Sequence, residues 1–131
     1  MRFGEYLRKK RLEDPRELTM QDLANHLDIS TSYMSEVENG RRNPFDHKRL
    51  EQIAEFLNLN ETDTAMLYDI ASRHNGEVPH DIQETLMYEP IGDLARFALR
   101  QSKAGFITEA DWKTFIRQME KKKAKHQGQQ T

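Results

Sequence analysis

Apolar residues recur at three- and four-residue spacing along most of the chain, which is the pattern of helices with one buried face. In the first such segment the apolar stripe contains Phe3, Tyr6, Leu7 and residues 10–12. The segment is expected to end before Pro15, because the residue preceding a proline is pushed out of the helical region. No stretch alternates between apolar and polar residues as a strand would. The pattern therefore predicts an all-α protein.

Two short helices joined by a turn of about three residues are predicted next. Thr19 is a good N-cap for the first helix and Ser30 for the second. Asp28 separates them, and Asn39-Gly40 ends the second helix, because glycine adopts a left-handed C-cap without strain. The positions expected to be buried are Leu23, Ala24 and Leu27, then Tyr33 or Met34, and Val37.

Further helices are expected over residues 50–57, 62–73, 81–87 and 91–101, and from residue 108 onward. The apolar positions expected inside the fourth and fifth helices are Leu50, Ile53, Ala54, Leu57, Met66, Leu67, Ile70 and Ala71. Asn75-Gly76 with Pro79 after it forms a strong break. We therefore predict a domain over residues 1–74 and a helical C-terminal region over residues 75–131, whose polar tail from residue 121 is expected to fray.

The two short helices have the arrangement of a helix-turn-helix. If Met34 and Val37 are buried, the outward face of the second helix carries Thr31, Ser32 and neighbouring small or polar residues. Short hydrogen-bonding side chains at the start of a helix can contact base edges in the major groove, where base pairs differ in donors and acceptors. The pattern therefore favours a DNA-binding protein.

The chain resembles the lambda-repressor-like, Cro/XRE-type family in the run Ile29-Ser30, Tyr33-Met34-Ser35 and Glu38-Asn39-Gly40-Arg41-Arg42-Asn43-Pro44. The resemblance covers residues 3–59 and implies a five-helix domain that binds a palindromic operator as a homodimer. Two positions depart from the family pattern: Met20 stands where a glutamine is usual, and Asp28 replaces the glycine of the turn. Aspartate visits the left-handed region more readily than most residues, so we expect the turn to be kept.

The resemblance and the outward face together give a set of candidate contacts. Base-edge contacts are predicted for Thr31, Ser32, Tyr33 and Glu36. Phosphate contacts are predicted for Thr19, Gln21, Ser35, Asn39, Arg41 and Arg42. Other interpretations stay open: Thr31 and Ser32 can simply extend the cap of Ser30, Tyr33 can belong to the core, and Glu36 can act only by excluding wrong sequences. The family also implies a buried structural ion pair between Glu38 and an arginine of the first helix, for which Arg11 is the match.

A looser resemblance extends over the C-terminal region, to small XRE-type regulators of mobile elements that often accompany an ImmA-type metallopeptidase. It rests on the runs Met66-Leu-Tyr-Asp-Ile-Ala, Val78-Pro-His-Asp-Ile, Leu99-Arg and Asp111-Trp-Lys-Thr-Phe-Ile. A protease of that type is therefore a possible partner. The apolar stripe Trp112, Phe115, Ile116 and Met119 either closes the core or forms a dimer interface, and we favour the dimer because affinity for DNA needs two half-sites.

Charge and composition narrow the choice of function. The net charge of -2 is not that of a strongly basic nucleic-acid-binding protein. The basic residues instead cluster over residues 41–49 and 113–125, whereas residues 61–93 are acidic. The alternative is therefore a protein-binding adaptor or antitoxin-like regulator that acts through its C-terminal helices.

No motif of an enzyme, metal site or cofactor site is present in the sequence. The chain has no cysteine, and its five histidines lack metal-ligand spacing. There is no nucleophile elbow and no glycine-rich phosphate loop. It also lacks an apolar signal segment or a run long enough to span a bilayer. We therefore expect a cytoplasmic protein without catalytic activity or cofactor.

Overall fold

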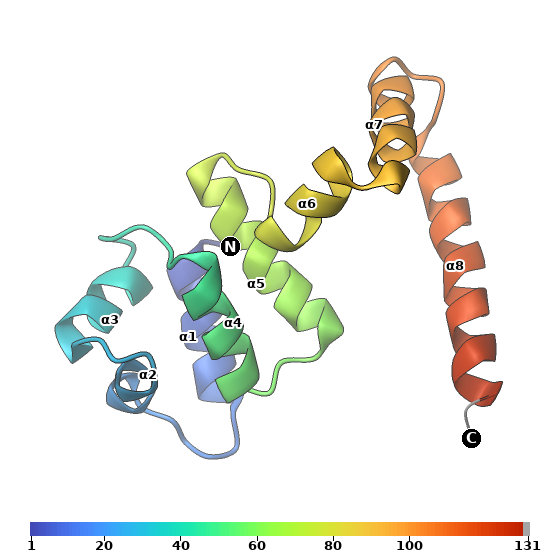
Figure 1. Ribbon diagram of the computed structural model, residues 1–131. Helices are drawn as coiled ribbons and strands as arrows, with labels where there is room; N and C mark the ends of the chain where they lie inside the picture. The colour runs from blue at the N-terminus through green and yellow to red at the C-terminus, as the bar shows by residue number, and fades with distance from the viewer. Residues whose placement is uncertain (130–131) are drawn as a thin grey trace. The chain divides into compact units, whose positions relative to one another are not determined.

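The computed structural model describes residues 1–129, and these residues form eight helices and no strand (Figure 1). The helices are α1 (Phe3–Glu13), α2 (Met20–His26), α3 (Thr31–Glu38), α4 (His47–Phe56), α5 (Glu61–Asn75), α6 (His80–Tyr88), α7 (Pro90–Lys103) and α8 (Glu109–Gln129). The chain divides into two compact units, Met1–Gln83 and the segment from Glu84 onward. The predicted all-α class, with a five-helix domain and a helical extension, is confirmed.

The first unit has a single hydrophobic core to which each of the helices α1–α5 contributes. The most deeply buried side chain of each helix is, in chain order, Leu7, Leu23, Met34, Ile53 and Leu67. Fully burying a side chain of this size contributes about 1.5–3 kcal/mol to folding. The two helices of the predicted helix-turn-helix are therefore held by the same core as α1, α4 and α5.

Two apolar residues that the sequence pattern placed inside are exposed instead. Leu12 is 62% exposed and Met66 is 47% exposed. Leu12 lies on the far side of α1 because each helical residue turns the chain by about 100°, which places Arg11 on the buried face. Leu67 and Ile70 take the inward positions of α5. The period of the pattern was correct in both helices, but the width of the buried stripe was overestimated.

The predicted ends of the two short helices are confirmed. Thr19 Oγ1 accepts a hydrogen bond from the Asp22 N–H at 3.0 Å, and the Asp22 carboxylate accepts one from the Thr19 N–H at 2.8 Å. Ser30 Oγ accepts a hydrogen bond from the Tyr33 N–H at 3.0 Å. Between the helices, Asp28 has a φ of 56°, the left-handed conformation expected for the turn.

The second unit contains the end of α6, all of α7 and α8. Gly92 of α7 packs against the end of α6, where a Cβ atom would lie 2.5 Å from the carbonyl oxygens of Thr85 and Leu86. Trp112 Nε1 of α8 donates a hydrogen bond to Ser102 Oγ of α7 at 2.7 Å. Among the described residues of this unit, no hydrophobic side chain is buried. The unit therefore has no apolar core within one chain.

The polar tail from residue 121 is helical as far as the structure describes it, and the predicted fraying of its end remains a prediction. Helix α8 continues to Gln129. The segment is rich in lysine, glutamine and alanine, which have high helix propensities and extend a helix that is already formed. Residues 130–131 lie outside the described residues.

The break predicted at Asn75-Gly76 is present, because Gly76 caps α5 with a φ of 67°. The first compact unit nevertheless extends beyond residue 74 to Gln83. It does so because the start of α6 packs back on the domain, with the ring of His80 4.4 Å from that of His47. The assignment of residues 75–131 to dimerisation or partner binding remains a prediction. None of the described helices is both long and apolar enough to cross a membrane.

Candidate nucleic-acid interface

Helices α2 and α3 are joined by a tight turn that fixes the angle between the two helices. The Ile29 N–H donates to the Ala24 carbonyl at 3.0 Å, so the turn closes back on α2. Ile29 packs against the core, and Met34 and Val37 bury the inner face of α3. The outer face of α3 is thereby turned away from the core (Figure 1).

The end of α3 packs on α1 at a crossing that only glycine permits. A Cβ atom at Gly4 would lie 2.4 Å from the Glu38 carbonyl oxygen and 2.5 Å from that of Val37. Gly4 could not be singled out from the sequence, because a glycine inside a helix gives no local signal of a tertiary contact. The absence of a side chain at Gly4 therefore determines how closely the end of α3 packs on α1.

A buried ion pair ties α3 to α1 at the same end. Arg11 Nη2 donates to Glu38 Oε1 at 3.0 Å, and the two side chains are 7% and 2% exposed. Arg11 Nη1 also donates to the Leu18 carbonyl at 3.0 Å, which fixes the segment leading into α2. The structure thus places the two residues of the predicted pair in contact, and this contact fixes both ends of the α2–α3 segment.

An aromatic stack connects the core to the surface beside α3. Buried Phe45 lies edge-on to Phe3, with ring centroids 6.3 Å apart, and parallel to Tyr33, with centroids 5.6 Å apart. The Arg42 guanidinium lies 4.4 Å from the centroid of the Tyr33 ring. Tyr33 is half-buried. It therefore belongs partly to the core and partly to the surface, and its predicted contact with a base or phosphate remains a prediction.

Glu36 and Arg42, which were assigned to separate contacts with bases and phosphates, form an ion pair with each other. The Arg42 Nε atom donates to Glu36 Oε2. The loop that carries Arg42 folds back because the Arg41 N–H donates to the Glu36 carbonyl at 2.8 Å. This pairing could not be predicted from the sequence, because the two residues are six positions apart and on different elements.

The remaining polar residues of the candidate site keep their side chains at or near the surface. Those exposed to solvent are Thr19, Gln21, Thr31, Ser32, Asn39 and Arg41. Ser35 is half-buried, and its Oγ accepts a hydrogen bond from Asn39 Nδ2 at 3.3 Å. At the start of α2, the hydrogen bond from the Thr19 N–H holds the pKa of the Asp22 carboxyl below its usual range, so this group is ionised at neutral pH.

Basic residues surround the end of α3. Arg41, in the loop that follows α3, is exposed, and the described residues offer its side chain no ion-pair partner. Arg2 and Arg8 of the N-terminal segment line a cavity of about 210 Å³ next to Asn39 and Gly40. Arg2 and Arg8 could not be assigned to this site from the sequence, since only the crossing of α1 and α3 brings them to this end. Glu5 lines the same cavity and pairs with Arg2 at 3.4 Å, so Arg8 and Arg41 supply the positive charge that remains at this end of α3 on a protein whose net charge is -2.

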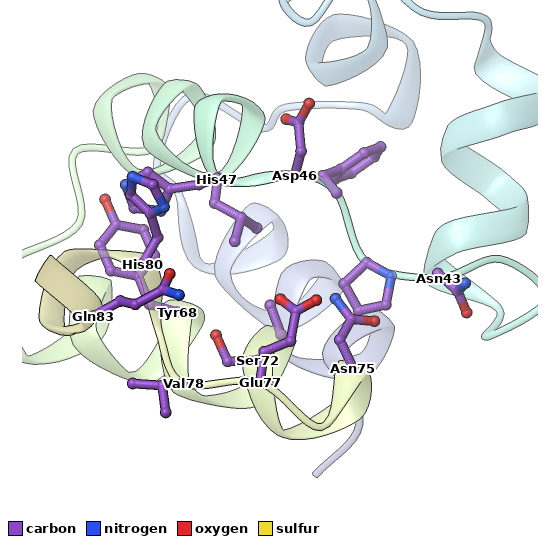
Figure 2. A pocket seen from close by; sticks show the side chains of 14 residues that line it. Asn43, Asp46, His47, Tyr68, Ser72, Asn75, Glu77, Val78, His80 and Gln83 are labelled. Carbon is purple, nitrogen blue, oxygen red and sulfur yellow. The ribbon is translucent and has the colours of Figure 1, made fainter. Parts of the chain in front are cut away.

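A cavity of about 500 Å³ lies on another side of the loop after α3, against α5 and the start of α6 (Figure 2). Figure 2 shows Ser72, Asn75 and Glu77 near one another, with the rings of His47 and His80 grouped together elsewhere in the lining. The lining contains carboxylates but no lysine or arginine, so it is not suited to phosphate. No group of three or more histidine or carboxylate side chains within residues 1–129 is placed to hold a metal ion.

Comparison with known protein families agrees with this geometry. A family model described as a helix-turn-helix domain matches residues 4–70, just over half of the chain's 131 residues. None of the curated proteins and none of the solved structures compared with the chain matches it. The matched segment contains α2, α3 and the core that supports them. The chain therefore belongs to the helix-turn-helix family and is a DNA-binding regulator of the Cro/XRE type.

Proposed function

We propose that the protein is a sequence-specific transcriptional repressor that binds a palindromic operator as a homodimer. The observation that carries this proposal is the outer face of α3, where Thr31 and Ser32 are exposed and the Arg42 guanidinium lies on the ring of the adjacent Tyr33. Side chains of this size let a helix approach the floor of the major groove closely. A protein bound there occupies the DNA that RNA polymerase needs, so the proposed role requires neither catalysis nor a cofactor.

In this proposal α3 enters the major groove and the groups around it bind the phosphate backbone. Thr31 and Ser32 contact base edges, whereas Arg41 and the start of α2 at Thr19 contact phosphates. The Thr19 and Asp22 N–H groups are already bonded within the cap of α2, so the proposed phosphate contacts there are made by the exposed side chains of Thr19 and Gln21. Asn39 and Ser35, joined by their hydrogen bond, lie toward the C-terminal end of α3.

The second unit supports the proposed homodimer, because its apolar residues are left uncovered. The large exposed side chains of α7 and α8 include Ile91, Leu94, Phe97, Phe115, Ile116 and Met119. Large apolar side chains left exposed on two consecutive helices favour an interaction site in a folded protein. A second copy of the chain is the occupant that a palindromic operator requires, since each copy supplies one α3 to one half-site.

The proposal predicts that Leu94→Glu separates the dimer and weakens DNA binding by about 100-fold, because a single chain loses the second half-site. Leu94 is 66% exposed, so the substitution should not unfold either unit. Sedimentation gives the number of chains, and fluorescence polarisation gives the Kd for DNA upstream of the protein's own gene. The parent should bind DNA as two chains. Because its proposed contacts are partly with phosphates, its affinity should fall by at least about tenfold when the salt concentration is raised from about 50 to about 200 mM.

Gln118→Glu is the matched control, because it adds the same charge to an exposed polar position of α8. It should leave both the number of chains and the Kd unchanged. A parent protein that sediments as one chain with or without DNA would contradict the homodimer. A parent protein that binds no DNA would contradict the repressor proposal and favour the alternative, an adaptor or antitoxin-like regulator whose apolar surface binds another protein, such as an ImmA-type metallopeptidase.

A further inference from the structure

We propose that Arg42 is a base-reading residue that recognises a guanine, and that Glu36 and Tyr33 hold it in position for this role. The inference rests on the proposed function and names one specificity determinant within it. It differs from the sequence-based assignment, in which Arg42 contacts a phosphate and Glu36 a base.

The first argument is the rigidity of the support beneath Arg42. Its guanidinium lies on the face of the Tyr33 ring, at 4.4 Å from the centroid. Tyr33 stacks on Phe45, which is 3% exposed and in turn contacts Phe3 in the core. A planar guanidinium on a fixed ring loses little conformational freedom when it binds. Arg42 is therefore more strongly preorganised than an arginine on an open loop.

The second argument is the geometry of the donors that remain available. Glu36 takes the hydrogen bond from Arg42 Nε, which leaves Nη1 and Nη2 for another partner. These two nitrogens form the fork that binds guanine O6 and N7 together, the commonest specific contact of arginine with DNA. The Arg42 side chain is 50% exposed, so the fork can reach a partner outside the protein.

The third argument is charge, which separates Arg42 from its neighbour Arg41. The carboxylate of Glu36 largely neutralises Arg42 and would itself repel a phosphate. The described residues contain no ion-pair partner for Arg41, whose side chain is exposed and keeps its full charge. Arg41 therefore suits the phosphate backbone, whereas the Arg42–Glu36 pair is better suited to directional recognition of a base.

The test compares two substitutions that both keep the positive charge, Arg42→Lys and Arg41→Lys. Full-length proteins select sequences from a randomised library of duplex DNA, and sequencing gives the base preference at each position. For the parent we expect a guanine at one position of each half-site. Arg42→Lys should lower that preference by about 5- to 150-fold and leave the other positions unchanged, because lysine cannot form the fork. Arg41→Lys should alter the affinity for all sequences by the same factor and leave the base preference at each position as in the parent, because a phosphate contact carries no sequence information.

Glu36→Gln tests the positioning role, since it removes the ion pair and keeps the size of the side chain. It should weaken the preference for the same guanine that depends on Arg42. Glu36→Gln could instead alter the base preference at a different position of the DNA while Arg42→Lys alters the preference at none. In that case Glu36 itself contacts the base and the inference is overturned. Equal melting temperatures of the variants exclude a loss of folding. A parent that selects no sequence would overturn the proposed function itself, whereas a parent and an Arg42→Lys variant that select the same sequence would overturn only this inference.

Discussion

Replacing Arg11 with alanine should lower the free energy of unfolding by about 3–5 kcal/mol, because it leaves the Glu38 carboxylate buried without its partner. Glu38 is 2% exposed in its side chain, so water cannot replace the lost guanidinium without opening the domain. The change also removes the hydrogen bond to the Leu18 carbonyl. Urea unfolding followed by circular dichroism measures the loss of free energy. A melting temperature within about two degrees of that of the parent, measured by thermal unfolding, would contradict the stabilising role of the buried ion pair.

Two further variants show whether this loss comes from the stranded charge. Arg8→Ala removes an exposed arginine from the same helix and should change stability by no more than about 0.5 kcal/mol. The double substitution Arg11→Met with Glu38→Leu should recover most of the stability, since it removes both charges and keeps the packing. Within the described residues, Arg11 Nε and Glu38 Oε2 have no hydrogen-bond partner, so the parent pair is itself incompletely satisfied.

Gly4→Ala should destabilise the first unit by about 3 kcal/mol, at the upper end of the cost of overpacking. The added Cβ would lie 2.4 and 2.5 Å from the carbonyl oxygens of Glu38 and Val37, and backbone atoms cannot move aside as a flexible side chain can. Amide hydrogen exchange at Leu7, Met34 and other core residues of this unit measures the change.

Gly128→Ala is the matched control for this prediction, because a Cβ atom at that position would have no described neighbour from outside the backbone of its own helix within 4 Å. Gly128→Ala should leave amide hydrogen exchange in the first unit unaltered. If Gly4→Ala left the protection of the core amides equal to that of the parent, the close crossing of α1 and α3 would be contradicted.

The features that the sequence predicted well are those set by neighbouring residues. Helix period, the caps Thr19 and Ser30 and the left-handed Asp28 depend on interactions within a few positions. The features it missed depend on the tertiary arrangement. Gly4 matters only where α1 meets the end of α3, and the Glu36–Arg42 pair exists only because the following loop folds back over α3.

The most direct test of the central claim, that α3 is the surface that enters DNA, is a nuclear magnetic resonance titration. The full-length protein, labelled with ¹⁵N, is mixed with duplex DNA from upstream of its own gene. The account predicts that the amide signals of Thr31, Ser32, Ser35 and Arg42 shift most strongly. Unchanged signals at these positions, together with shifts confined to α7 and α8, would contradict it.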